Sequence, residues 1–190
     1  MEKYKHSVYG KTTPAEGKHW MLCGDDRMQS LKIILEGLEH SKETLSDKDL
    51  HSIGLIDPSD IEFYFGIELL ALQNYLIQTT NDLNKIFKVK GKVESHMYNS
   101  HSSKIHGYQY NKIQLIHACA NYFKHKDDKL YKHILVVLKD FGLYTEKKLK
   151  DEDNYLLTEA YNFINPTYKT HAVLDLLSEW RTNVINFLEE

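Results

Sequence analysis

The sequence predicts an all-α protein, folded as a single bundle of five to seven helices. Apolar residues recur at three-to-four spacing in five separate segments, which is the period of a helix with one buried face. The chain has only 3 prolines and 9 glycines among its 190 residues, and so few helix breakers leave room for long helices. No segment alternates apolar and polar residues persuasively, so strands are not expected.

The composition fits one globular domain spanning residues 1–190. Hydrophobic residues make up 42% and charged residues 27% of the chain, enough apolar material for a core. A formal net charge of −3 gives no overall basic field, so tight non-specific binding to duplex DNA is not expected.

Signals for export, membrane insertion and disulfide bonding are missing from the sequence. The first residues contain no apolar stretch of the kind that directs secretion, and no run approaches the about 18 apolar residues of a membrane span. Cys23 and Cys119 match no metal or redox spacing and suit reduced thiols. We therefore expect a cytoplasmic protein that does not associate with a membrane.

The N-terminal third is expected to contain one irregular segment and one helix. Glycines and a proline punctuate residues 1–24, which are predicted to be irregular. A helix is predicted at residues 25–40, where Asp25 and Asp26 suit the positive end of the helix dipole. Residues 41–58 are polar and are expected to form a loop, with room for one short helix.

The longest predicted helix spans about residues 60–87 and is expected to be the central helix of the bundle. Ser59 and Glu62 have the spacing of a capping box. The apolar stripe that follows consists of Phe65, Leu69, Leu72, Leu76, Thr79, Leu83 and Ile86. Residues 89–107 break this pattern and are predicted to be an exposed connection.

The second half of the chain is expected to contain four helices. They are predicted at residues 108–126, 129–141, 154–164 and 169–188. Gly142 is a typical residue after a helix end, and Asn165-Pro166 cannot continue a helix. The residues at the centres of the stripes are predicted to be buried, namely Leu72, Leu76, Ile116, Ala120, Phe123, Ile134 and Trp180.

The helix at residues 108–126 carries the most suggestive polar residues. His117, Asn121 and His125 are four residues apart and therefore share one face, which we call the polar stripe. Lys124 and Asp128 flank it. A histidine can transfer protons near neutral pH, a lysine can neutralise phosphate, and an asparagine can hydrogen-bond a ribose or a base edge. The alternative interpretation is the solvated face of an amphipathic helix.

The segment Ala-Asn-Tyr-Phe-Lys-His at residues 120–125 resembles the HEPN superfamily of small helical bundles. Catalytic members of that family have an arginine, a polar residue that is often asparagine, and a histidine a few residues later. Asn121 and His125 match the polar residue and the histidine, whereas the arginine position holds Ala120. Lys124 could supply positive charge in place of the arginine, without its planar fork.

The resemblance implies a metal-independent endoribonuclease, or a degenerate RNA-binding relative, of a toxin or phage-defence system. In the catalytic version, His125 acts as general base or acid, Lys124 stabilises the phosphorane charge and Asn121 orients the scissile phosphate. His117, Tyr122 and Asp128 would be further RNA contacts. The family usually pairs two such helices, so a homodimer is expected, with no cofactor and no metal.

Other residues of the sequence leave alternatives open. His96, His101 and His106 recur every five residues, which favours loop histidines over a metal site, because that spacing spreads ligands over different faces. Glu68 lies beside the apolar stripe, where it faces solvent or pairs with Lys124 or a histidine.

Three tyrosines lie on or near the candidate helix, namely Tyr108, Tyr110 and Tyr122. Such aromatic side chains either close the edge of a core or stack on unpaired bases.

Two functions follow from the sequence. The first is an RNA-directed, HEPN-like protein. The second is a non-catalytic helical module, such as an immunity, antitoxin-like or scaffold component, whose apolar stripe binds a partner protein. The missing arginine favours the second function, and the polar stripe favours the first.

Overall fold

The computed structural model describes residues 25–45, 58–87, 99, 101–126, 128, 130–145 and 155–189. These residues form six helices and no strand, which confirms the predicted all-α bundle of five to seven helices. The helices are α2 (Asp26–Leu45), α4 (Pro58–Ile86), α6 (Lys112–His125), α7 (Lys132–Asp140), α8 (Leu156–Ile164) and α9 (Thr170–Glu189). The predicted irregular segment at residues 1–24 lies outside the described residues, as does Cys23.

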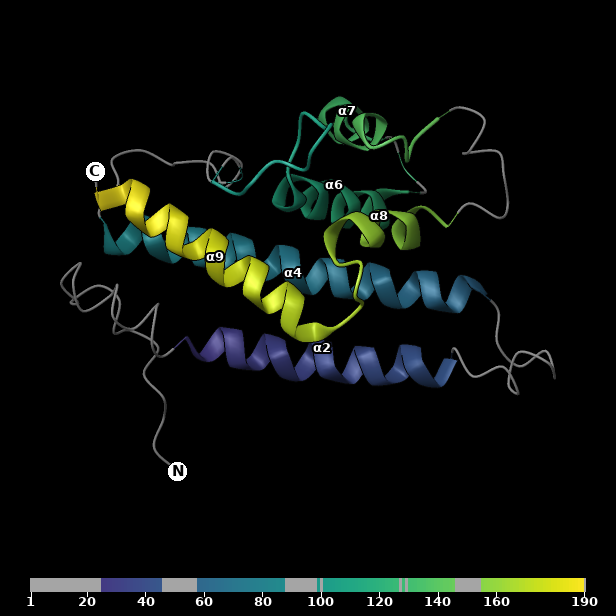
Figure 1. The fold of residues 1–190 in the computed structure, drawn as a ribbon, viewed down its shortest axis with the longest axis horizontal. Coiled ribbons are helices and arrows are strands. Elements are labelled where there is room, and N and C mark those ends of the chain that lie inside the picture. The colour runs from purple at the N-terminus through teal and green to yellow at the C-terminus, as the bar shows by residue number, and fades with distance from the viewer. Residues whose placement is uncertain are drawn as a thin grey trace.

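The helix α4 is the centre of the bundle, as its predicted length suggested. It contacts α2, α6, α8 and α9, and it lies between α2 on one side and α6 with α7 on the other (Figure 1). Its predicted stripe is buried from Phe65 to Ile86, Thr79 included. None of the helices in the described ranges is both long enough and apolar enough to cross a membrane.

Two helix boundaries differ from the prediction by four residues or more. The helix α6 begins at Lys112, four residues later than expected, because the side chain of Asn111 accepts a hydrogen bond from the backbone N–H of Gln114. The Gln114 side chain in turn accepts from the backbone N–H of Asn111, which completes a capping box. The helix α2 continues to Leu45 rather than ending near residue 40.

The predicted end of α7 at Gly142 is confirmed. Gly142 has a φ of +68°, a left-handed conformation that glycine adopts without a steric penalty. Its N–H donates to the Lys139 carbonyl at 3.0 Å, and the Leu143 N–H donates to the Leu138 carbonyl at 2.9 Å. These two bonds are a Schellman motif, which satisfies the last carbonyls of the helix.

The predicted capping box of α4 is wrong with respect to Glu62, whereas the side chain of Ser59 lies outside the described part of the structure. The Glu62 carboxylate accepts hydrogen bonds from the backbone N–H groups of Leu157 and Thr158, at 2.5 and 2.9 Å. These donors belong to the first turn of α8, which has no intrahelical partners for them. Glu62 therefore joins α8 to α4 instead of capping its own helix.

Six of the seven predicted core residues are buried, and Phe123 is the exception. Its half-buried ring lies near the C-terminal end of α6, against Phe63 of α4. Phe63 is itself 55% exposed, so this aromatic pair covers the rim of the core. The ring of Phe123 also covers Gly66, where an added Cβ would lie only 2.3 Å from it.

Glu68 is buried in the bundle, so the expectation that it faces solvent is wrong. Its partners are the Lys42 ammonium and the Tyr161 hydroxyl, rather than Lys124 or a histidine. The Lys42 nitrogen also lies 4.4 Å from the ring centroid of Phe65 and 4.9 Å from that of Tyr161. We call these four residues the Lys42–Glu68 cluster.

A second buried ionic cluster lies at the other end of α2. The Asp25 carboxylate accepts from the Tyr75 hydroxyl at 2.7 Å and from Arg181 Nη1 at 2.7 Å. It also accepts from the backbone N–H groups of Arg27 and Met28, so it caps α2. We call Asp25, Tyr75 and Arg181 the Asp25–Arg181 cluster.

A third carboxylate caps the last helix and makes stability depend on pH. Glu39 accepts from the backbone N–H of Thr170, at the start of α9, and from the Lys169 ammonium. Burial alone would raise its pKa, but the hydrogen bonds from Thr170 and Lys169 outweigh it and lower the pKa of Glu39 to about 2.

We expect Glu39→Gln to lower the free energy of unfolding by about 1–2 kcal/mol at neutral pH. The folded-state pKa lies below the ordinary value of 4.5, so the contribution of Glu39 is present above that pH and is lost as the pH falls toward 2. Urea unfolding of the wild type and of Glu39→Gln at several pH values should show that the difference in free energy of unfolding becomes smaller as the pH is lowered. A difference that stays constant with pH would contradict the assignment.

Candidate functional site

The helix α6 presents its apolar residues to the core and its polar stripe to one side. Its buried residues are Ile113, Leu115, Ile116, Ala118, Cys119 and Ala120. His117, Asn121 and His125 are each half-buried, at the boundary between the core and solvent. Burial raises the pKa of the Cys119 thiol, so this cysteine is an inert packing residue rather than a nucleophile.

Two members of the polar stripe line a cleft of about 790 Å³ between α6 and α7. His117 and Asn121 form one wall of this α6–α7 cleft, and His133 belongs to the opposite wall. The described residues that line it are Asn99, Tyr110, Gln114, His117, Ala118, Asn121, His133, Ile134, Val136 and Val137. None of these is an acid, a lysine or an arginine, so this described part of the lining carries no charge while its histidines are neutral.

The third member, His125, lies beyond the lining of the cleft. Its Nδ1 is 3.9 Å from a carboxylate oxygen of the exposed Asp128. Its ring meets the ring of Tyr131 edge-on, with 6.2 Å between centroids. Tyr131 in turn stacks on His133 at 5.8 Å, so a row of rings connects His125 to the cleft wall.

Lys124 points toward α4 rather than toward the cleft. Its ammonium donates to Gln73 Oε1 at 2.7 Å, and partial burial lowers its pKa. The Nε2 atom of the same Gln73 lies 3.4 Å from His117 Nδ1. The sequence placed Lys124 and Asn121 in one catalytic set. In the structure, Lys124 contacts Gln73 of α4, whereas Asn121 lines the α6–α7 cleft.

The tyrosines near α6 have separate roles. Tyr122 is half-buried and packs against the core, and it is not among the described residues that line the cleft. Tyr108 stacks on Phe141 with 4.6 Å between centroids, and it also packs against Phe163. Only Tyr110 of the three lines the α6–α7 cleft.

Sequence reasoning missed Asn99 and His133 as members of the site. Asn99 falls within the predicted exposed connection, yet it is only 6% exposed, and its backbone carbonyl accepts from the Asn111 side chain. Its own Oδ1 is buried and has no hydrogen-bond partner among the described residues. The sequence did contain a pattern that could have indicated His133. This histidine lies off the apolar stripe of α7 and follows another aromatic residue, Tyr131, by two positions.

The remaining histidines of the sequence do not gather at a site. His101 stacks on the ring of Phe187 at 4.3 Å, His106 is exposed, and His96 lies outside the described residues. Across the ranges that the structure describes, no group of three or more histidines, cysteines and carboxylates is arranged to hold a metal ion.

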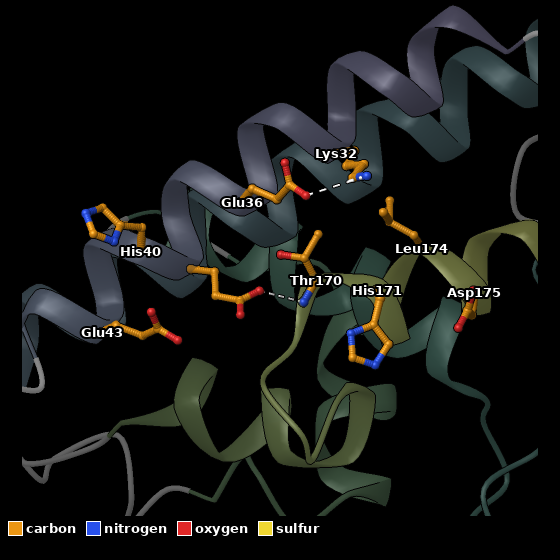
Figure 2. Close-up of a pocket in the computed structure, with 9 residues that line it drawn as sticks. Lys32, Glu36, His40, Glu43, Thr170, His171, Leu174 and Asp175 are labelled. Carbon is orange, nitrogen blue, oxygen red and sulfur yellow. Dashed lines mark hydrogen bonds and ion pairs between the residues drawn. The ribbon is translucent and has the colours of Figure 1, made fainter.

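A second pocket, of about 460 Å³, lies between α2 and α9, and its lining contains Glu36, Glu39, Glu43 and Asp175 (Figure 2). Two of these carboxylates, Glu39 and Glu43, accept from the Lys169 ammonium at 3.0 and 2.9 Å. The helix α2, which forms one wall of this acidic α2–α9 pocket, and the helix α7 lie on opposite sides of α4 (Figure 1). The described residues of α2 and α9 therefore gather four carboxylates at one pocket.

Comparison of the chain with protein-family models, curated proteins and solved structures found no match.

Proposed function

We propose that this protein binds single-stranded RNA across the surface formed by α6 and α7. The observation that supports this proposal is the α6–α7 cleft, where His117, Asn121 and His133 lie together beside the ring of Tyr131. Concave sites with an apolar base and a few convergent polar groups are the usual form of ligand sites. The HEPN resemblance of residues 120–125 points to the same helix.

Charge supports an anionic ligand on this side of the molecule. The helices α6 and α7 together carry four lysines and a single aspartate, although the whole chain has a net charge of −3. Lys124 and Lys126, at the C-terminal end of α6, and Lys132, the first residue of α7, are exposed. Phosphate groups would therefore approach α6 and α7, whereas the α2–α9 pocket would repel them.

Aromatic side chains supply a surface on which unpaired bases can stack. Tyr131 is 61% exposed and lies nearly parallel to the ring of His133, at an angle of 18°. Stacking on such rings favours single strands, because the bases of a duplex are already stacked on one another.

We propose binding rather than cleavage as the main activity. The arginine position of the family motif is occupied by Ala120, which is fully buried, and Lys124 is engaged by Gln73. If the chain does cleave RNA, His125 would take the proton of a ribose 2′-hydroxyl, and no metal would be needed. Pairing of two copies through α6, which the resemblance implies, stays a prediction.

We expect Tyr131→Ala to weaken binding of labelled single-stranded RNA about tenfold, because one stacking contact is worth about 1–3 kcal/mol. His125→Ala should also weaken binding, or abolish any cleavage that persists in EDTA. Fluorescence anisotropy at low and rising salt measures the affinity, and gel electrophoresis of the same RNA detects cleavage. The matched controls are Phe187→Ala and His171→Ala, which remove exposed rings from α9 and should bind RNA as the wild type does.

A wild-type protein that neither retains nor cuts RNA at low salt would refute this proposal. The helical protein-interaction module would then be the better account. An equal loss of RNA affinity in Tyr131→Ala and in the α9 control variants would also count against binding at the α6–α7 surface, since α9 is not part of that surface.

A further inference from the structure

We infer that the exposed ring of Phe63, on α4, stacks against a base of the bound RNA, so that one strand crosses the end of α6 between two aromatic sites. This inference rests on the proposed RNA binding and extends it beyond α6 and α7. The first site is the Tyr131–His133 pair of α7. The second consists of the rings of Phe63 and Phe123 with the ammonium of Lys126, and we call it the Phe63–Phe123 site.

Phe63 presents an accessible aromatic ring on α4. Its side chain is 55% exposed, although apolar residues of a bundle helix usually turn toward the core. Its ring meets those of Phe123 and Tyr64 at angles of 62° and 87°, with 5.9 and 6.2 Å between centroids. Neither contact is a parallel stack. An exposed ring that is held in place by such edge contacts is suited to stacking on a base.

The charges beside this ring pair favour an anionic, aromatic ligand over an apolar one. Lys126 is exposed, and its ammonium lies 6.0 Å from the centroid of the Phe123 ring. The helix α6 contains no acidic residue, and Glu62, the neighbour of Phe63 in the sequence, accepts from the backbone of α8. Asp60 is exposed one turn before Phe63, so phosphates would follow the side of Lys126. Aromatic rings combined with cations are typical of surfaces that bind single-stranded nucleic acids.

The two sites lie on different sides of α6, near its C-terminal end. The helix α6 lies between α4 and α7 (Figure 1). Its Phe123 contacts Phe63 of α4, whereas its His125 contacts Tyr131 of α7. Two residues correspond to a rotation of about 200° around a helix axis, and a helix with its side chains is about 10–12 Å across. At about 3.4 Å per stacked nucleotide, a strand that reaches both sites needs at least about four nucleotides.

The test is the dependence of affinity on RNA length, measured by fluorescence anisotropy with a labelled uridine trinucleotide and octanucleotide. Phe63→Leu keeps an apolar side chain but removes the aromatic ring. It should weaken binding of the octanucleotide about tenfold, and that of the trinucleotide less than about twofold, because the trinucleotide reaches only one site at a time. Phe63→Trp should bind the octanucleotide at least as tightly as the wild type. The matched control is Phe187→Leu, at a ring of similar exposure on α9, which should leave both affinities unchanged.

Thermal unfolding and light scattering test two other roles for Phe63. Because more than half of this side chain is exposed, Phe63→Leu should melt close to the wild-type temperature. A clear drop in melting temperature, with Phe63→Trp weakened as much as Phe63→Leu, would overturn the inference in favour of a packing role beside Phe123. A wild-type dimer that Phe63→Leu converts into a monomer with unchanged RNA affinity would overturn it in favour of a contact between two copies of the chain.

The remaining outcomes distinguish this inference from the proposed function. Equal affinity of the wild type and Phe63→Leu for the octanucleotide would overturn the second stacking site while leaving RNA binding at α6 and α7 in place. Equal weakening for both lengths would also overturn it, since the two oligonucleotides would then share one site. Failure of the wild type to bind either oligonucleotide at low salt would overturn RNA binding, and with it the inference that rests on it.

Discussion

Asp25→Ala should lower the free energy of unfolding by about 3–5 kcal/mol. The substitution leaves Arg181, which is 5% exposed, without the carboxylate that lies 2.7 Å from its Nη1. An arginine cannot shed its charge at accessible pH, so the buried guanidinium stays charged and uncompensated. Tyr75 loses its acceptor in the same step, and α2 loses its N-cap.

Asp25→Asn is the matched control for this prediction. The asparagine keeps one acceptor oxygen, which can cap the first turn of α2 in place of Oδ1. It removes the negative charge and places an amide NH2 group where Oδ2 accepted from Tyr75 and Arg181. Its loss of stability, measured by urea unfolding, should be smaller than that of Asp25→Ala, because the cap of α2 is retained. A loss below about 1 kcal/mol for Asp25→Ala would mean that Arg181 finds another partner or reaches solvent.

Glu68→Leu is the second substitution with a large expected effect, again about 3–5 kcal/mol. Lys42 is 7% exposed and would remain among the rings of Phe65 and Tyr161 without its counter-ion. Burial, followed by the charge of Glu68, raises the pKa of Tyr161, so its hydroxyl keeps its proton. That hydroxyl would lose the acceptor that Glu68 provides.

The double variant Lys42→Met with Glu68→Leu should recover most of this stability. It replaces both charges with apolar groups of similar length, and buried ion pairs exchanged in this way are often neutral in stability. Denaturant unfolding of the wild type, the two single variants and the double variant closes a thermodynamic cycle. Losses that simply add in the double variant would show that the two side chains do not interact.

Local sequence patterns predicted most of the helices because the apolar stripe of a helix is encoded in neighbouring residues. The stripe of α4 and the end of α7 at Gly142 were both confirmed. The late start of α6 was also encoded, since Asn111 and Gln114 have capping-box spacing, but the apolar residues before them concealed it. Phe123 was wrongly assigned to the core. Periodicity gives the direction in which a side chain points, but it does not show whether a neighbouring helix covers that side chain completely.

Pairings across long stretches of chain could not be predicted in the same way. Lys42 belongs to α2 and Glu68 to α4. No pattern in the sequence around either residue indicates that the two side chains form an ion pair. The same holds for Glu62. Its side chain was predicted to cap its own helix, but it accepts hydrogen bonds from the backbone of α8 instead. At the candidate site, the sequence indicated His117 and Asn121, whereas Asn99 and His133 join them only through folding.

The two buried ionic clusters set the register of α2 along α4. Leucine side chains such as Leu31 and Leu35 pack without strong directionality, so they alone would tolerate a slide of α2 by one helical turn, about 5.4 Å. Asp25 and Lys42 are anchored near opposite ends of α2. A slide in either direction would separate both pairs at once and leave several charges buried without partners. Electrostatics therefore adds to close packing in opposing alternative alignments of this helix.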